Sequence, residues 1–575
     1  MSIVNLIVLI VLLLSLYQCD ACTNIIVERS ASTDSSNIIG YNADSIGLYG
    51  SLYHYPAADH AEGAMRDVFN WDNGQYYGAI KEAQHTYNVV GNMNEFGLSI
   101  GETTFGGLSI LSTQSKAKID YGSLIWITLQ RAKSAREAIK VMDQLMSEYG
   151  YASGGESFSV IDNNEAFIME IIGKGEYELG SVWVAVKVPE GHITAHANQA
   201  RIRNFPLNDP ENCLHSKDVI SFAKKLGLYS GEDKDFSFSD IYDPITFSGA
   251  RMCEARVYSI FSSVVGEDFA NQYLDYAMGY NLTNRMPLFV KPSSKLSTAT
   301  VMKLFRSHYE GFPNDMSGNT FADIGATGAY SPYRNHPLSW SSQGSSYFNE
   351  RPISTQQTGW NFIAQSRAWM PKELSGLLWF GVDDSGTTVR FPIYGSAYRV
   401  PEAFAGRGAQ DGETTPMTTF DTTKAFTVFN LVANFAYANW NLVYPDVVAK
   451  IESLETDYSS RVNDIDSKAI ELYNSGTVSD AVDFVTQFSE DLGNTLVKEW
   501  YAYFGQLFVK YKDGYVMNKD SNNKQCGCSA ANAGYPQPWY DAIATTTGDH
   551  YKTPTSLSSE EKIKTIPKEK LLALR

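Results

Sequence analysis

The sequence predicts a mixed α+β protein in which layered sheets are covered by helices. From residue 22 to about residue 200, short strand-like runs dominate, and two helical segments interrupt them. From residue 422 to 509 the apolar residues change to helical spacing. Strand pairs, a helix pair and further strand pairs in this order are typical of stacked layers around one core. With 575 residues, 43% of them hydrophobic, the chain can form such a core.

The strand-like runs of the first half are bounded by turn-forming residues. We expect a hairpin of residues 23–27 and 36–41, and a second strand pair at 87–90 and 97–100 joined by 92–95. Helices are predicted over 122–132 and 134–149, with Ser134 as the N-cap of the second. Further strands are expected at 157–161, 166–172, 182–188 and 193–197.

The second half begins with irregular sequence and ends with helices. Residues 310–360 are rich in Ser, Gly, Asn, Pro and Tyr without periodicity, which predicts a long loop region. A strand pair is expected around 377–382 and 388–394. Pro445 marks a helix start, followed by apolar residues at helical spacing. The last sixty or so residues show no core pattern.

The first residues have the pattern of a secretory signal peptide. An apolar run from Ile3 to Leu16 precedes small residues at Cys19 and Ala21, which predicts cleavage after Ala21. The run is shorter than the roughly 18 residues of a membrane span. No Lys or Arg precedes it, so an uncleaved signal anchor is the alternative. We expect a secreted or lysosomal protein without stable membrane insertion, glycosylated at the Asn281 sequon.

Charge and cysteine content narrow the classes of function. A net charge of −18 repels phosphate backbones, so we expect no nucleic-acid partner. Cleavage after Ala21 leaves five of the six cysteines, so four can pair and one thiol remains. Cys22 is the candidate for that thiol. The pair Cys526 and Cys528 is too tightly spaced and too isolated for a zinc site.

Signal cleavage would make Cys22 the first residue of the mature chain. A thiol acts as a nucleophile only after a base has taken its proton. An N-terminal cysteine carries its own base, because the α-amine has a pKa of roughly 7.7–8.0. The other interpretation is that Cys22 is an ordinary cysteine that happens to follow a cleavage site. The position of Cys22 alone favours this second interpretation.

Ordered motifs decide between these interpretations. The segments 21–27 and 38–45 resemble the opening of the peptidase C69 dipeptidases, which are N-terminal nucleophile hydrolases related to penicillin V acylases and bile acid hydrolases. Further segments resemble this family in the same order, at 91–98, 155–158 with 168–170, 197–202, 255–258 and 306–310. The resemblance covers most of residues 22–510. It implies an αββα sandwich with a C-terminal helical region.

The resemblance also implies roles for individual residues. Cys22 would be both nucleophile and base, and Asp44 would hydrogen-bond the α-amine or the substrate. Asn94 and Asn198 would donate hydrogen bonds to the oxyanion, each worth roughly 3–4 kcal/mol. Arg256 would favour the thiolate by its positive charge. Tyr41 and Asn42 would contact the substrate.

One position departs from the family pattern. Tyr41 stands where the family usually has an arginine before the Asn-x-Asp motif. A phenol can donate a hydrogen bond, but it carries no permanent charge near neutral pH. We therefore expect a less activated thiol, or another cation that takes over.

Taken together, the sequence predicts a secreted cysteine dipeptidase that acts on small peptides, needs neither metal nor organic cofactor, and has an undetermined oligomeric state. Its parts would be a signal peptide (1–21), a catalytic domain (22–420), a helical region (421–515) and an irregular tail (516–575). The alternatives are an acylase or amidase of the penicillin V or bile-acid hydrolase type, a Cys–His protease, and a catalytically weak secreted binding protein. For the protease, His196 lies before Asn198, but we expect it to be structural.

Overall fold

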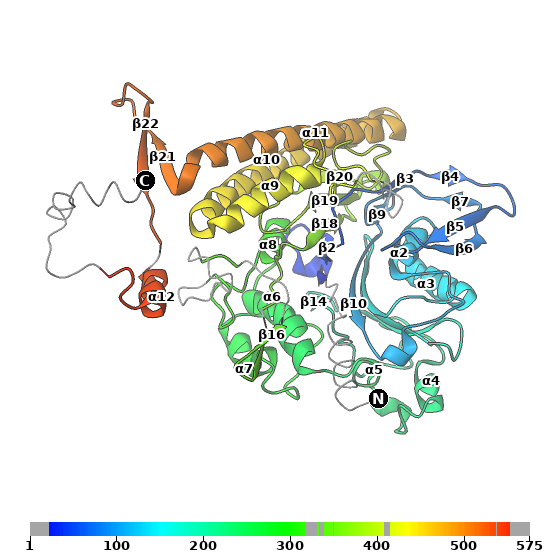
Figure 1. Cartoon of the computed structure of the whole chain (residues 1–575). Helices are drawn as coiled ribbons and strands as arrows, with labels where there is room; N and C mark the ends of the chain where they lie inside the picture. The colour runs from blue at the N-terminus through cyan, green and yellow to red at the C-terminus, as the bar shows by residue number, and fades with distance from the viewer. Residues whose placement is uncertain are drawn as a thin grey trace.

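Two antiparallel sheets form the centre of the molecule in the computed structural model (Figure 1). The structure describes residues 22–45, 47–317, 330–332, 339–348, 350–406, 415–535 and 537–552. The predicted signal peptide, 1–21, lies outside these ranges. The mixed α+β class predicted from the sequence is confirmed.

The first sheet has six strands and carries the start of the described chain. Its order is β14-β1-β2-β18-β19-β20. The strands are β1 (Thr23–Val27), β2 (Asn37–Asp44), β14 (Ile193–His196), β18 (Thr358–Ser366), β19 (Gly376–Val382) and β20 (Phe391–Tyr394). As predicted, β1 and β2 form a hairpin, with Ile26 opposite Ile39.

The second sheet has eight strands in the order β15-β13-β12-β11-β10-β9-β8-β3. The strands are β3 (His54–Tyr55), β8 (Val89–Val90), β9 (Met93–Asn94), β10 (Ser99–Gly106), β11 (Gly155–Ile161), β12 (Ala166–Gly173), β13 (Ser181–Lys187) and β15 (Cys213–His215). Strands β1 and β2 of the first sheet pack against β10 and β11 of this one. The buried interface between the sheets therefore lies next to Cys22.

Helices cover the outer faces of both sheets (Figure 1). On the second sheet lie α2 (Tyr121–Leu129), α3 (Ala135–Tyr149) and α4 (Val219–Lys225). On the first lie α6 (Ala255–Val265), α8 (Thr298–Leu304), α9 (Ala425–Ala438), α10 (Trp440–Ser475) and α11 (Val478–Lys510). Ser134 caps α3 as predicted, because its hydroxyl accepts from the Glu137 amide. The layers thus follow the order helix, sheet, sheet, helix.

Smaller elements complete the described fold. They are the helices α5 (Phe238–Tyr242), α7 (Glu267–Ala277) and α12 (Gln537–Thr547), and the hairpins β4 (Ala58–Asp59) with β7 (His85–Thr86), β5 (Met65–Phe69) with β6 (Tyr76–Lys81), β16 (Ser339–Ser342) with β17 (Ser345–Phe348), and β21 (Tyr515–Lys519) with β22 (Cys528–Asn532). No helix in the described ranges has both the length and the hydropathy needed to cross a membrane.

Two predictions of irregular structure were wrong in part. The expected loop over 310–360 contains the β16–β17 hairpin and the first residues of β18, a central strand. The tail after residue 515 forms the β21–β22 hairpin and α12, both largely exposed. Its composition hid them because neither element buries an apolar face. Residues 318–329, 333–338 and 553–575 lie outside the described part of the chain.

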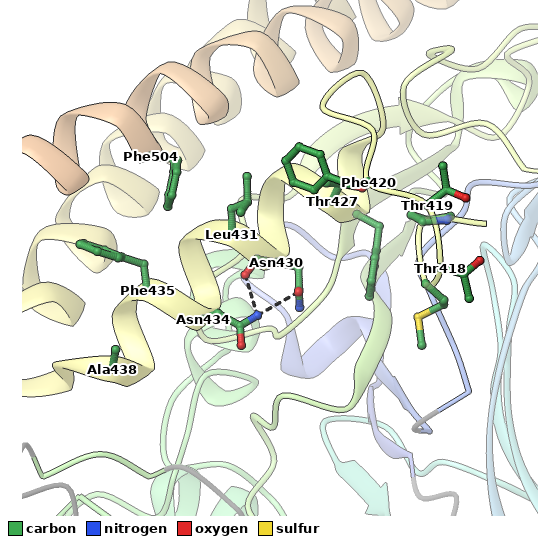
Figure 2. Close-up of a pocket in the computed structure, with 13 residues that line it drawn as sticks. Thr418, Thr419, Phe420, Thr427, Asn430, Leu431, Asn434, Phe435, Ala438 and Phe504 are labelled. Atoms are coloured by element: carbon green, nitrogen blue, oxygen red, sulfur yellow. Dashed lines mark hydrogen bonds between the residues drawn. The ribbon is translucent and has the colours of Figure 1, made fainter. Parts of the chain in front are cut away.

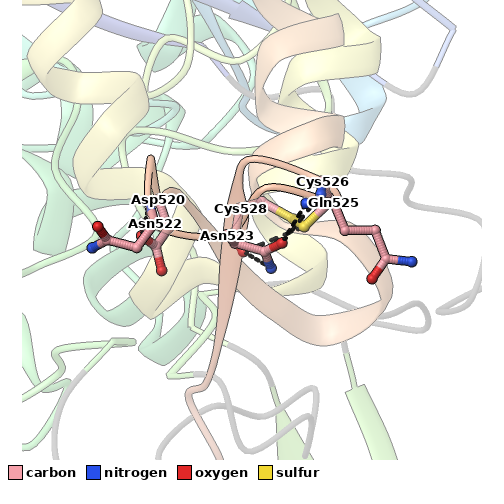
Figure 3. Close-up of a disulfide and its surroundings, with 6 residues drawn as sticks. All are labelled: Asp520, Asn522, Asn523, Gln525, Cys526 and Cys528. Atoms are coloured by element: carbon pink, nitrogen blue, oxygen red, sulfur yellow. Dashed lines mark hydrogen bonds between the residues drawn. A yellow bond between two sulfur atoms is a disulfide. The ribbon is translucent and has the colours of Figure 1, made fainter.

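Of the described cysteines, only Cys526 and Cys528 form a disulfide (Figure 3). Asn523 holds the turn that contains it, because its side chain accepts from the Cys526 amide and donates to the Cys528 carbonyl. Cys22, Cys213 and Cys253 are buried thiols. The expectation that four cysteines pair therefore fails, since Cys213 and Cys253 are not joined.

Candidate active site

Cys22 lies directly before β1, between the two sheets, and its side chain is buried. Its sulfur is 3.5 Å from Glu102 Oε1 on β10 and 3.6 Å from the Tyr41 hydroxyl on β2. Tyr41 also donates a 2.5 Å hydrogen bond to the same Glu102 oxygen. Two side chains, from β2 and β10, therefore meet at the predicted nucleophile.

The surroundings of the Cys22 thiol oppose its ionisation. Burial raises the pKa well above the usual value, and the carboxylates of Glu102 and Asp44 raise it further. Hydrogen bonds from the Asp44 backbone and the Tyr41 hydroxyl act in the other direction, but they are smaller. The Cys22 thiol is therefore protonated near neutral pH.

Arg256 fixes the backbone at this position. One Nη atom donates to the Cys22 carbonyl at 2.7 Å and to the Thr23 hydroxyl at 2.9 Å. The other donates to the Ala197 carbonyl at 3.1 Å and to Asn198 Oδ1 at 2.9 Å. Because the guanidinium is fully buried and planar, it locks β1 against the 197–198 turn. Its charge lowers the pKa of Asp44, whereas carboxylates are the main charges acting on the thiol.

Asp44 is buried at the end of β2. Its Oδ1 accepts from Thr358 at 2.7 Å, and Arg351 lies 4.0 Å from its Oδ2. Burial raises the Asp44 pKa to about 6, against the lowering effect of Arg351. A carboxylate held this way can accept a hydrogen bond from an amine near Cys22.

The two predicted oxyanion donors differ in their placement. Asn198 has a positive φ of 64° and lies beside Arg256, with its amide donating to the Thr104 carbonyl at 2.6 Å. The structure does not bring Asn94 into this group. The Asn94 amide donates to the carbonyls of Leu129 and Ala132, where α2 ends, so both of its hydrogens are engaged.

Tyr41 and Asn42 lie on opposite faces of β2, as neighbours on a strand do. Tyr41 faces Cys22, whereas the Asn42 amide donates to the Ile353 carbonyl and the Ser385 hydroxyl. Asn281 is exposed, and its side chain donates to Asp275 and accepts from Thr283. Its glycosylation stays a prediction.

His196 is buried between the sheets, with Thr103 and Ser159 hydroxyls on its two ring nitrogens at 2.7 and 2.8 Å. Burial lowers its pKa to about 3, so the ring is neutral. A neutral ring with both nitrogens engaged by hydroxyl groups fits a structural histidine rather than a Cys–His pair.

Sequence reasoning missed Glu102 as a site residue. It occupies an inward-facing position of β10 and touches the thiol directly. The available signal was an acidic residue inside a strand of otherwise apolar and small residues, at Gly101-Glu102-Thr103. Glu156 lies on the neighbouring strand β11, within the 155–158 segment that resembles the family.

A surface cavity of about 660 Å³ lies elsewhere, between α9 and residues 416–420 (Figure 2). Its walls include Phe420, Phe435 and Phe504, and Asn434 donates to Asn430 on its floor. None of the predicted site residues lines it.

Comparison with known proteins identifies the family. The family model for peptidase family C69 matches residues 46–453. The chain belongs to peptidase family C69. The match begins after Cys22 and Asp44, so these two positions lie outside it. As a member of this family, the protein is a peptide-bond hydrolase.

Curated relatives of this C69 peptidase carry dipeptidase names. A probable dipeptidase of Salmonella dublin is 28% identical over 404 residues, which cover 67% of this chain and 83% of the relative. A probable dipeptidase of Latilactobacillus sakei is 24% identical, covering 67% and 76%. Probable dipeptidase B of Streptococcus pyogenes serotype M1 is 24% identical, covering 68% and 75%.

Proposed function

We propose that this C69 peptidase is a secreted or lysosomal dipeptidase with Cys22 as its N-terminal nucleophile. The observation that carries the proposal is the setting of Cys22: Arg256 fixes its backbone, and Tyr41 and Glu102 contact its sulfur. The dipeptidase names of the relatives support small peptides as substrates. We further propose that the layered fold is that of the N-terminal nucleophile hydrolases.

The proposed reaction has two stages. After cleavage behind Ala21, the free α-amine of Cys22 takes the thiol proton as sulfur bonds to the substrate carbonyl carbon. The C–N bond then breaks, the leaving amine takes that proton, and an acyl-enzyme thioester remains. Water attacks the thioester, which restores the thiol and releases the second product. Asn198 lies beside Arg256 and is the closer of the two predicted oxyanion donors to this centre.

Mass spectrometry of the secreted protein tests whether the mature chain begins at Cys22, as the mechanism requires. A mature chain that begins at Cys22 makes the amine available. An uncut signal removes the base, and a start after Cys22 removes the nucleophile, so either result refutes this mechanism.

Activity assays test the nucleophile itself. We expect Cys22→Ala to lower dipeptide hydrolysis by at least about 1,000-fold. Cys213→Ala is the matched control, because it removes another buried thiol on β15. Full activity of Cys22→Ala would exclude Cys22 as the nucleophile. N-acyl amino acids assayed in parallel separate dipeptidase from acylase specificity.

A further inference from the structure

Two buried carboxyl groups face each other beside the nucleophile. Thr104 on β10 pairs with Glu156 on β11, so Glu102, two residues earlier, lies diagonally opposite Glu156 on the same sheet face. The two side chains lie close enough to influence each other's ionisation, and Thr104 donates to Glu156 Oε1 at 2.8 Å. Both carboxyl groups are almost fully buried.

Within the described ranges, no ion pair joins Glu102 or Glu156 to an arginine, lysine or histidine. Burial raises the pKa of Glu102 to about 7, and burial with the Glu102 charge raises that of Glu156 further. Two buried carboxyl groups in this setting favour keeping a bound proton, and an ammonium group can supply positive charge in its place.

Glu102 lies where it can contact one particular substrate atom, the nitrogen of the free α-amine. In the acyl-transfer step the substrate carbonyl carbon bonds to Cys22 Sγ, and Glu102 Oε1 is 3.5 Å from that sulfur. In a peptide with a free N-terminus, the α-amine is two bonds from the attacked carbonyl carbon. An α-ammonium group at this place is within hydrogen-bonding reach of a carboxylate that touches the sulfur.

We propose that Glu102, paired with Glu156, binds the free α-ammonium group of the substrate residue whose carbonyl is attacked. This inference rests on the proposed function and deepens it, because it states why the substrate is a dipeptide with an unblocked N-terminus. Tyr41 holds Glu102 Oε1 in place, and because position 41 carries a neutral phenol rather than an arginine, it does not neutralise this carboxylate.

The test compares free and N-acetylated substrates that are otherwise identical. The mature enzyme and its Glu102→Gln variant are assayed for kcat/KM on Ala-Ala and on N-acetyl-Ala-Ala. We expect Glu102→Gln to lower kcat/KM for the free dipeptide by on the order of 10- to 100-fold, since a charge-assisted hydrogen bond is lost. For the acetylated substrate we expect no more than about a threefold change.

Controls keep the outcome interpretable. Glu165→Gln removes a carboxylate from the β11–β12 turn, far along the same strands, and is expected to leave the ratio of the two rates unchanged. Alkylation of Cys22 by neutral iodoacetamide reports that the site of Glu102→Gln has folded.

Each result decides the proposal. Selective loss on the free dipeptide supports it. An equal loss on both substrates overturns it, because Glu102 then acts on the thiol or on the Cys22 α-amine. Equal wild-type rates on both substrates also overturn it. A wild type inactive on both refutes the proposed function itself, which is a different failure.

Discussion

At the scale of single residues, the site is assembled from groups that burial holds uncharged. The thiol of Cys22 and the carboxyl of Glu156 both have pKa values raised well above the usual range, and desolvation is the largest cause for each. Arg256 supplies a fixed charge in contact with the Cys22 backbone. The protonation states of Cys22 and Glu102 therefore depend on a small number of hydrogen bonds, among them those of the Tyr41 hydroxyl.

Replacing Tyr41 by Phe tests the hydrogen bond from the Tyr41 hydroxyl to Glu102. The Tyr41 hydroxyl lowers the Glu102 pKa by donating to it, so its removal raises that pKa above about 7. The carboxylate form then exists only at higher pH. We expect the acidic limb of the kcat/KM profile on free dipeptides to move to higher pH, with a larger loss of activity at pH 6 than at pH 8. An unchanged limb would show that Glu102 ionisation does not control the rate.

Replacing Arg256 by Lys tests the anchoring of Cys22. A lysine keeps the charge but cannot reproduce the four hydrogen bonds made by the two Nη atoms. We expect kcat to fall by about 10- to 100-fold, because small displacements of a nucleophile are costly. Circular dichroism checks the fold, and a variant with wild-type kcat would contradict the positioning role.

At the scale of elements, the parts predicted correctly are those specified locally. The β1–β2 hairpin follows from alternating runs around one turn, and α3 from its Ser134 cap and spacing. Strand β18 was missed for two reasons. One of its partners, β2, lies far earlier in the chain, so no local pattern reports the pairing, and a bulge interrupts the first residues of β18. Glu102 was missed for a similar reason: its contact with Cys22 spans 80 residues.

The helical layer offers a stability test with a neighbouring control. Trp500 of α11 is fully buried, with its ring stacked on Phe429 of α9 at 5.4 Å, whereas Tyr501 is 45% exposed. We expect Trp500→Ala to cost about 3–5 kcal/mol in the free energy of unfolding, measured by denaturant titration. Tyr501→Ala should cost less than about 0.5 kcal/mol. Similar losses in both variants would mean that α11 does not pack as described.

At the scale of the whole molecule, many buried acids share one direction of pKa shift. Burial raises the pKa of Glu170 to about 8, of Asp243 to about 7, and of Asp120 and Asp44 to about 6. Between pH 4 and 8 the unfolded chain releases these protons before the folded protein does. The folded state thus binds more protons, and stability falls as pH rises. His196, with its pKa lowered to about 3, acts in the opposite direction, as do His54 and Glu165, whose pKa values are also lowered.

We therefore expect the unfolding temperature to be higher at pH 5 than at pH 8, by roughly 5 °C. Calorimetry at constant ionic strength measures this difference in unfolding temperature. Glu170→Gln should reduce the slope, because it removes the acid with the highest of these four pKa values. A protein that is more stable at pH 8 would contradict the assigned protonation states. An acid-stable fold would suit a lysosome-like compartment as well as the outside of the cell.

The ion pairs of α10 determine how short this protein can be made. The family match ends at residue 453, inside α10, but Glu455 and Asp466 lie just beyond it. Glu455 binds Arg306, and Asp466 binds the buried Arg367. A chain cut where the match ends would lose both acids together with all of α11, which packs on β20 and α9, and would expose the apolar core beneath that helix. For anyone choosing an expression boundary, the limit of recognisable sequence is therefore the wrong place to stop.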